Sequence, residues 1–176
     1  MIKALPGTIA PKFAGVAAHS NGKFSDISMD ELLSKEGQWL LLFFYPLDFG
    51  YISPSELMEL NKIKGELDKL KCQIIACSTD SAVTHEKFLS VPPSNGGVQG
   101  IEFPLLEDVS GSISENYGVL RDQSGYTFRA YFVIDNNGFI RSRTVCDLPI
   151  GLGTDEIVGK VESLQKAQSQ ENWLHE

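Results

Sequence analysis

The chain has few cysteines, few positive charges and no long apolar runs. Its 176 residues include three cysteines, and 15 Lys and Arg stand against 23 Asp and Glu, for a formal net charge of -8. An odd number of cysteines with no Cys-x-x-Cys pair argues against a disulfide scaffold and a structural zinc site. The acidic balance offers no basic field to a nucleic acid or an anionic membrane. We therefore expect no nucleic-acid or membrane partner, no metal and no cofactor.

No apolar stretch reaches the roughly 18 residues that a membrane helix requires. The longest apolar run, residues 39–45, has the length of a strand. Residues 1–7 form neither a charged segment followed by an apolar one nor an Arg-rich amphipathic pattern. We expect a cytoplasmic location.

The length fits one globular domain. Because the sequence shows no repeat and no linker, we expect a single domain over residues 1–168 and a short tail over 169–176. Apolar periodicity and turn residues predict strands over 13–17, 23–25, 39–45, 73–78, 129–134 and 139–145. They predict helices over 28–37, 53–70, 81–89, 110–117 and 154–168, of which 53–70 is the longest. This order predicts an α/β sandwich with a mixed sheet.

Two Ser-x-x-Glu sequences match the capping box at the start of a helix. The first joins Ser28 to Glu31, and the second joins Ser53 to Glu56 with Pro54 at the first helical position. A capping hydroxyl accepts a hydrogen bond from a backbone N–H of the first turn and stabilises the helix by about 1 kcal/mol. We expect Ser53 to cap its helix in this way.

Residues 43–56 read Phe-Phe-Tyr-Pro-Leu-Asp-Phe-Gly-Tyr-Ile-Ser-Pro-Ser-Glu. This segment resembles the active-site motif of the peroxiredoxins, Phe-Tyr-Pro-Leu-Asp-Phe-Thr-Phe-Val-Cys-Pro-Thr-Glu. Further segments fall in family order and spacing, namely 77–81 with His85, 104–108, 117–120, 129–135 and 147–151. The similarity extends over residues 5–168 and is greatest to the typical two-cysteine branch. It implies a thioredoxin-like α/β fold with a central mixed sheet flanked by helices.

The resemblance places Ser53 at the position of the family's peroxidatic cysteine. That nucleophile is a thiolate at a helix N-terminus, which attacks peroxide and persists as a sulfenic acid. A serine hydroxyl stays protonated at physiological pH and has no equivalent oxidised state, so we expect residue 53 to lack peroxidase chemistry. A serine hydrolase is disfavoured, because His19, His85 and His175 fall in a hairpin turn, a surface helix and the tail.

The chain departs from the family pattern at three more places. Gly50 replaces the Thr before the nucleophile, and Leu152 replaces the second Arg after Gly151. The C-terminal Val-Cys-Pro segment with the resolving cysteine is replaced by residues 167–176. These departures favour natural loss of catalysis over one engineered substitution.

Pro46, Glu56 and Arg129 remain from the family's pocket. Each also has a structural explanation: Pro46 ends a strand, Glu56 completes a capping box, and Arg129 can pair with Glu56. Since Gly50 removes a side chain, we also expect space for a small anion or other ligand at the N-terminus of the helix that starts at Ser53, in contact with Arg129.

The three cysteines are poor replacements for the family's nucleophile. Cys72 and Cys77 bracket an apolar strand and are expected to be buried and neutral. Cys146 ends a strand just before Asp147, and it is the one cysteine for which a redox role stays open.

We expect a peroxiredoxin-like protein that has lost its peroxidase activity and serves in assembly, partner binding or ligand binding. Two alternatives stay open. The chain is a thiol-dependent peroxidase in which Ser53 is an engineered substitution or another cysteine acts, or it is a small-molecule carrier that uses the vacated pocket. Because family members pair through edge strands and stack dimers into rings, the resemblance implies a homodimer and, beyond it, a decameric ring. Aromatic candidates for such surfaces are Tyr45, Phe49, Tyr51 and Trp173, of which Tyr45 is expected in the core.

Overall fold

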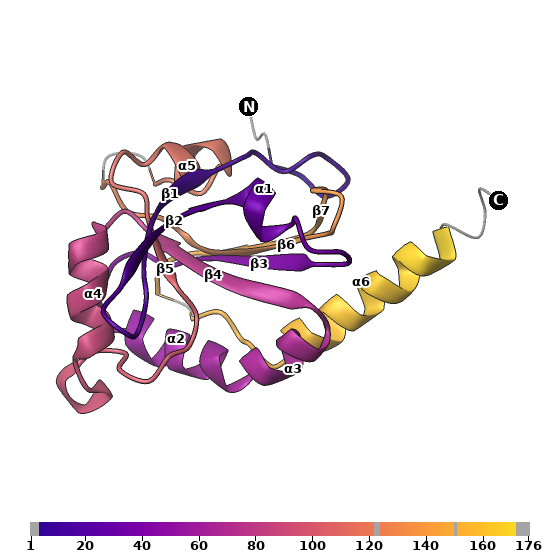
Figure 1. The fold of residues 1–176 in the computed structure, drawn as a ribbon. Coiled ribbons are helices and arrows are strands. Elements are labelled where there is room, and N and C mark those ends of the chain that lie inside the picture. Colours follow the sequence, from indigo (N-terminus) through magenta and orange to yellow (C-terminus); the bar gives the residue numbers. More distant parts are fainter. Residues whose placement is uncertain (1–3, 122–123, 150, 172–176) are drawn as a thin grey trace.

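One seven-stranded sheet forms the centre of the molecule in a computed structural model, which describes residues 4–121, 124–149 and 151–171 (Figure 1). The strands are β1 (Ala14–Ala18), β2 (Phe24–Ser28), β3 (Trp39–Phe44), β4 (Cys72–Ser78), β5 (Leu105–Glu107), β6 (Arg129–Ile134) and β7 (Ile140–Cys146). The helices are α1 (Met29–Leu32), α2 (Ser53–Lys62), α3 (Lys64–Lys69), α4 (Ala82–Ser90), α5 (Ser112–Asn116) and α6 (Ile157–Glu171), with a 3-10 turn at Pro93–Asn95.

The sheet is mixed, and its order is β2-β1-β5-β4-β3-β6-β7. Strand β4 runs parallel to β3 and β5, whereas β6 is antiparallel to both β3 and β7. All six residues of β3 are buried. This agrees with their uninterrupted apolar sequence, which is typical of a central strand covered on both faces.

Helices cover the two faces of the sheet unequally (Figure 1). One face packs against α2, α3, α4 and α6 through side chains such as Leu57, Leu67, Phe88 and Val161. The other face packs against α1, α5 and the N-terminal segment, with Met29 among its buried side chains. The candidate site lies on the first face, where the loop after β3 enters α2.

The predicted strands are confirmed, but the prediction of one longest helix over residues 53–70 was wrong. Helix α2 ends at Lys62, Ile63 separates it from α3, and α6 is the longest helix of the described residues. At Ile63 the backbone stays in the right-handed region (φ -92°, ψ -2°), but its N–H donates to the Leu60 carbonyl three residues back, which interrupts the α-helical hydrogen bonds. The apolar spacing continues past this residue. Periodicity therefore could not show the break. Helix α1 also ends early, at Leu32 instead of near Gly37.

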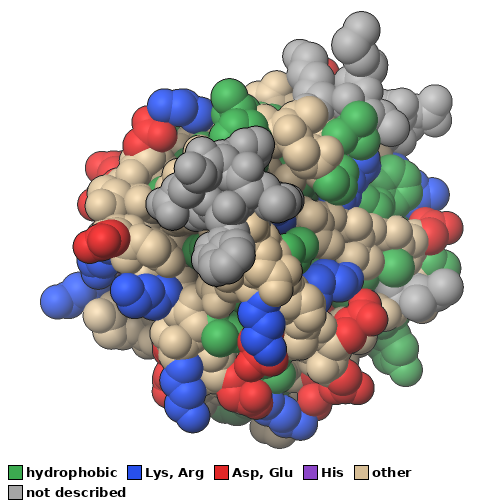
Figure 2. All heavy atoms as spheres, turned by 90° about the vertical axis from the view of Figure 1, so that its right-hand side faces the viewer, with side chains coloured by type: hydrophobic (Ala, Val, Ile, Leu, Met, Phe, Trp, Pro, Cys, Tyr) green, Lys and Arg blue, Asp and Glu red, His purple; other side chains and the backbone are tan. Residues whose placement is uncertain are grey.

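No helix among the described residues is long and apolar enough to cross a membrane. On the face that includes the end of α6, Lys and Arg side chains alternate with Asp and Glu, and no field of one sign appears (Figure 2).

Candidate active site

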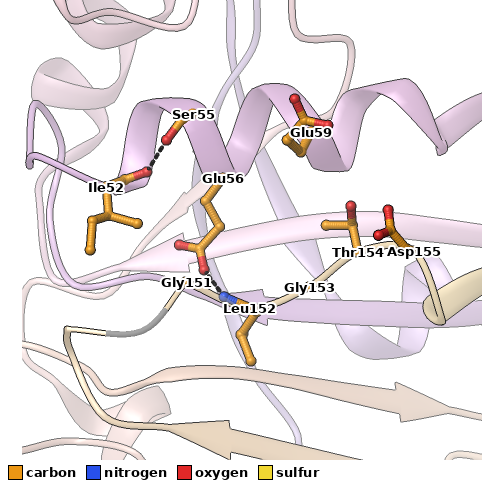
Figure 3. Close-up of a pocket in the computed structure, with 9 residues that line it drawn as sticks. All are labelled: Ile52, Ser55, Glu56, Glu59, Gly151, Leu152, Gly153, Thr154 and Asp155. Atoms are coloured by element: carbon orange, nitrogen blue, oxygen red, sulfur yellow. Dashed lines mark hydrogen bonds between the residues drawn. The ribbon is translucent and has the colours of Figure 1, made fainter.

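The site begins where α2 starts. Contrary to the prediction, Ser53 does not cap this helix. Ser53 is the first helical residue, and the cap is Ile52, whose carbonyl accepts from the Glu56 N–H at 3.1 Å. The Ser55 hydroxyl also donates to that carbonyl at 2.9 Å (Figure 3). A capping hydroxyl requires an extended backbone, as at Ser28, which accepts from the Glu31 N–H as predicted. Ser53 is already helical and cannot reach back to the first-turn N–H groups.

The Ser53 hydroxyl is instead buried without a partner. Only 1% of the residue is exposed, and its Oγ makes no hydrogen bond to any described residue. Burying a hydroxyl without a hydrogen bond is unfavourable. Such a group marks a place that a ligand could satisfy.

One turn further along α2, Glu56 forms a buried ion pair with Arg129 of β6. Glu56 also accepts from the Leu152 N–H at 2.6 Å, and its side chain points from α2 toward the loop over residues 151–155 (Figure 3). The Arg129 Nε donates to the Leu148 carbonyl at 3.0 Å. Burial raises the pKa of Glu56, and the Leu152 N–H and the Arg129 charge oppose this rise. Glu56 therefore anchors α2 to β6 and does not complete a capping box.

Pro46 and Gly50 shape the loop between β3 and α2. Pro46 is buried two residues after the end of β3, and a Cβ at Gly50 would lie 3.3 Å from the Leu47 carbonyl oxygen and 3.4 Å from the Ser53 Oγ. A Cβ at residue 50 would thus be slightly tight against the Leu47 carbonyl and in ordinary van der Waals contact with the Ser53 hydroxyl. On its outer side, Gly50 borders a surface groove of about 610 Å³ lined also by Phe49, Tyr51, Pro54 and Met58.

Two of the three thiols are fully buried, as predicted. Burial raises the pKa of Cys72 to about 12 and raises that of Cys77 well above its usual value. Cys146 is half-buried at the end of β7, where the strand register places it directly opposite Arg129. No group of three or more His, Cys, Asp or Glu among the described residues could hold a metal ion.

His85 lies on α4, which has an exposed outer face as expected of a surface helix, but its side chain points to the interior. His85 is fully buried because it lies on the inner face of α4, with Nδ1 at 2.8 Å from Asp48 and Nε2 at 3.2 Å from the Leu106 carbonyl. His19 lies near Ser25 in the first hairpin. Sequence reasoning missed the Asp48 contact, although both residues stand in segments that carry the family resemblance.

The last histidine and the aromatic candidates for an assembly surface lie partly outside the described residues. His175 and Trp173 lie outside the described residues. Tyr45 is buried in the core as expected, whereas Phe49 and Tyr51 are exposed.

Residues 6–143 match the sequence model of the AhpC/TSA family. The chain belongs to the AhpC/TSA family. Peroxiredoxin 2 of Drosophila melanogaster is 40% identical to it over 156 residues, which are 89% of this chain and 78% of the relative. A thioredoxin peroxidase of Echinococcus granulosus is 37% identical over 162 residues, which are 92% of this chain and 82% of the relative.

Solved structures of peroxiredoxins are also similar to this chain. A reduced 2-Cys peroxiredoxin of Plasmodium vivax superposes with a TM-score of 0.88 at 34% identity, covering 93% of this chain and 83% of the other. Prx1a of Plasmodium yoelii, modified at its N-terminus and described as an artifactual octamer, superposes with a TM-score of 0.85 at 32% identity over 94% of each chain. The predicted thioredoxin-like α/β fold, with its central mixed sheet, is confirmed.

The expectation that the chain has lost its peroxidase activity is contradicted. Relatives that match about nine-tenths of the chain are named peroxiredoxins and thioredoxin peroxidases. The expectation rested on the chemistry of a single side chain, Ser53. It gave too little weight to the thiols elsewhere in the chain, among which Cys146 lies beside Arg129.

Replacing Ser53 by Ala is expected to stabilise the protein. The change removes a buried hydroxyl that has no partner, and we expect the free energy of unfolding to rise by about 1 kcal/mol. Urea unfolding followed by tryptophan fluorescence measures this. Ser55→Ala is the matched control, since it removes a hydroxyl that does donate a hydrogen bond. A loss of stability in Ser53→Ala would show that the hydroxyl has a partner in the folded protein.

Proposed function

We propose that this chain is a thiol-dependent peroxidase, which reduces a peroxide at the expense of thiols. Its membership of the AhpC/TSA family and the names of its relatives support this function. The observation that carries the proposal is the position of Arg129. Glu56 holds the Arg129 guanidinium beside the first turns of α2, and Cys146 lies across the β6–β7 ladder from it.

We further infer that Ser53 stands where the family motif has its peroxidatic cysteine. The motif around residues 43–56 supports this alignment, as does the position of Ser53 in the first turn of α2. A hydroxyl at this place cannot form a sulfenic acid. The reacting sulfur therefore has to come from another part of the chain.

Cys146 is the thiol best placed to react. Cys72 and Cys77 are fully buried and their pKa values are raised, so their thiolates are disfavoured. Cys146 is half-buried, and its side chain lies on the same face of the sheet as the cation Arg129. Of the three thiols, Cys146 is thus the one that is partly exposed.

The reaction balances with an external thiol as reductant. The Cys146 thiolate attacks one peroxide oxygen, the O–O bond breaks, and the leaving oxygen takes a proton to give water or an alcohol. A first external thiol then displaces water from the sulfenic acid and forms a mixed disulfide. A second external thiol attacks that disulfide, which releases Cys146 and a disulfide product.

Hydrogen peroxide consumption with dithiothreitol as reductant tests the proposal. We expect turnover above the protein-free rate, and we expect Cys146→Ser to abolish it because the substitution removes the only thiol beside Arg129. The buried Cys72→Ala and Cys77→Ala variants are the controls and should retain turnover if they fold. No consumption by the wild type, or consumption unaffected by Cys146→Ser, would contradict the proposal.

Ser53→Cys is expected to increase peroxide consumption. A thiol in the first turn of α2 gains stabilisation of its thiolate from the helix N-terminus, which lowers cysteine pKa values by one or more units. We expect kcat/KM for hydrogen peroxide to rise by about tenfold or more, since a one-unit shift changes the thiolate fraction about tenfold. Ser55→Cys is the matched control, because Ser55 lies in the same turn but is exposed. Equal rates in the two variants would show that the surroundings of residue 53 do not activate a thiol.

A second candidate function is the binding of a small anion at the start of α2. The unpartnered Ser53 hydroxyl favours it, because helix N-termini attract anions and this hydroxyl has no partner among the described residues. Such a ligand would accept from Ser53 and lie near the Arg129 charge. In this role the chain is a carrier of small carboxylates or of sulfate.

Calorimetric titration with formate, acetate and sulfate tests the anion site. We expect binding to the wild type and weaker binding to Ser53→Ala, which loses a donor. Ser55→Ala should bind like the wild type. The absence of heat with all three anions would contradict the carrier function but not the peroxidase.

We propose that the chain forms a homodimer through β7, and that dimers can assemble further into a decameric ring. Strand β7 pairs with β6 on one side, and on its other side the N-terminal segment covers only its start, where the Gly7 N–H donates to the Ile140 carbonyl and the Ile140 N–H donates to the Thr8 carbonyl. No strand of the described residues pairs with the rest of that edge. The partly exposed Val145 lies in the unpaired part of β7, whereas Phe139 precedes the strand and is bridged to Ile9. An uncovered strand offers its backbone N–H and C=O groups to a second copy. The octameric neighbour supports homo-oligomers in general.

Sedimentation equilibrium at micromolar concentration measures the assembly. We expect a species of at least twice the 19.4 kDa chain mass. Val145→Lys, which places a charge at the edge, should shift the equilibrium to monomer through like-charge repulsion between copies. A wild type that sediments only as a monomer would contradict the assembly.

A further inference from the structure

A second buried polar cluster lies beside the candidate site and joins the loop before α2 to helix α4. Asp48 in the loop and His85 in α4 are 4% and 0% exposed. The His85 Nδ1 lies 2.8 Å from the Asp48 Oδ2, and the Tyr45 hydroxyl donates to the Asp48 Oδ1 at 2.8 Å. On the other side of the ring, Nε2 lies 3.2 Å from the Leu106 carbonyl oxygen.

The partners of His85 determine how many protons the pair holds. Both ring nitrogens face oxygen atoms, a carboxyl oxygen and a backbone carbonyl, but a neutral imidazole has one N–H and one lone pair. If Asp48 were ionised and His85 neutral, one nitrogen would direct its lone pair at an oxygen. Two other states satisfy every group: an imidazolium with a carboxylate, or a neutral imidazole that accepts from a carboxylic acid. Both contain one proton more than the unsatisfied state.

The charges around Asp48 and His85 favour the states that contain the extra proton. Asp80 follows β4 and accepts from the Asp48 N–H at 2.8 Å, and Glu107 of β5 accepts from the Ala82 N–H at the start of α4. Both are carboxylates near the pair, and the Tyr45 hydroxyl is the titratable group that donates to Asp48. Burial raises the pKa of Asp48, and the hydrogen bond and charge of His85 oppose this only in part.

The loop that carries Asp48 leads to Ser53 within a few residues. Phe49 follows Asp48 in a left-handed conformation (φ 55°), and its ring packs on Phe88 of α4 with centroids 4.9 Å apart. A non-glycine residue in this region is strained and persists only where its surroundings hold it. Gly50 comes next and approaches the Ser53 Oγ closely. Contacts to α4 through Asp48 and Phe49 thus determine where the chain enters α2.

We propose that Asp48 and His85 are positioning residues that share one proton and thereby hold the loop over residues 46–52, and with it Ser53 and the start of α2. The pair acts in this way whichever thiol reacts and whether or not an anion binds.

Asp48→Asn tests the shared proton. The amide keeps the shape of the carboxyl, donates to the His85 Nδ1 and accepts from the Tyr45 hydroxyl, but it carries no titratable proton. Between pH 6 and 8 the two unfolded chains bind equal numbers of protons, because an unpaired aspartate is ionised there. The folded wild type holds one proton more than the folded variant, so rising pH destabilises the wild type relative to the variant.

The measured quantity is the ratio of the two unfolding equilibrium constants, from urea unfolding at pH 6, 7 and 8. We expect the ratio of wild type to Asp48→Asn to rise tenfold per pH unit, about 100-fold over this range. His19→Asn is the matched control, since His19 is not part of a buried pair, and its ratio to the wild type should not follow this slope. A ratio for Asp48→Asn that stays constant with pH would show that the pair holds no extra proton and would overturn the proposal.

The positioning of Ser53 is tested separately, with a thiol introduced by Ser53→Cys as reporter. Its alkylation by iodoacetamide at pH 7 is followed by peptide mass mapping. We expect Asp48→Ala in this background to raise the alkylation rate several-fold, because the loop loses its contact to α4, and Asp48→Asn to leave it near the parent rate. Tyr45→Phe removes one hydrogen bond to Asp48, so it gives an intermediate rate and serves if Asp48→Ala does not fold. Equal rates in all variants would overturn the positioning role.

Discussion

The buried ion pair between Glu56 and Arg129 connects the parts of the structure that meet at the candidate site. It joins α2 to β6, and through the Leu148 carbonyl and the Leu152 N–H it fixes the chain that leads from β7 to α6. Taking two charges out of water is costly, and removing one partner from such a pair destabilises a protein by roughly 3–5 kcal/mol. The ion pair therefore fixes the first turns of α2 relative to the sheet. It thereby also fixes where Ser53 and Gly50 lie.

A second buried pair, Asp48 with His85, holds the opposite side of the same loop. The start of α2 thus lies between two buried contacts of acidic and basic groups, one to β6 and one to α4. Neither contact depends on what occupies residue 53. This explains how the loop before α2 keeps its shape although the buried Ser53 hydroxyl has no partner among the described residues. It also explains how Phe49 tolerates a left-handed backbone conformation.

The three cysteines of this fold differ in how far they are buried, and only a partly exposed thiol can meet a peroxide. Cys72 and Cys77 lie within β4, the strand beside β3, and burial raises the pKa of both thiols. Cys146 lies on the outer strand, half-buried and opposite Arg129. Membership of the AhpC/TSA family therefore fits a chain in which a hydroxyl occupies the first turn of α2, provided that a sulfur reaches the same guanidinium from β7.

The sequence by itself determined six of the seven strands, the mixed α/β class and the family, because apolar runs, turn residues and an active-site motif are local or ordered along the chain. It did not predict β5, which has only three residues. It also led to the pairing of Glu56 with Arg129, because both lie in segments that carry the family resemblance. The single domain over residues 1–168 and the cytoplasmic location stay predictions. Only the tertiary structure decided that Ser53 is buried and does not cap, that His85 is internal, and that Cys146 faces Arg129. Burial and cross-strand register are set by packing between distant segments, which no local pattern encodes.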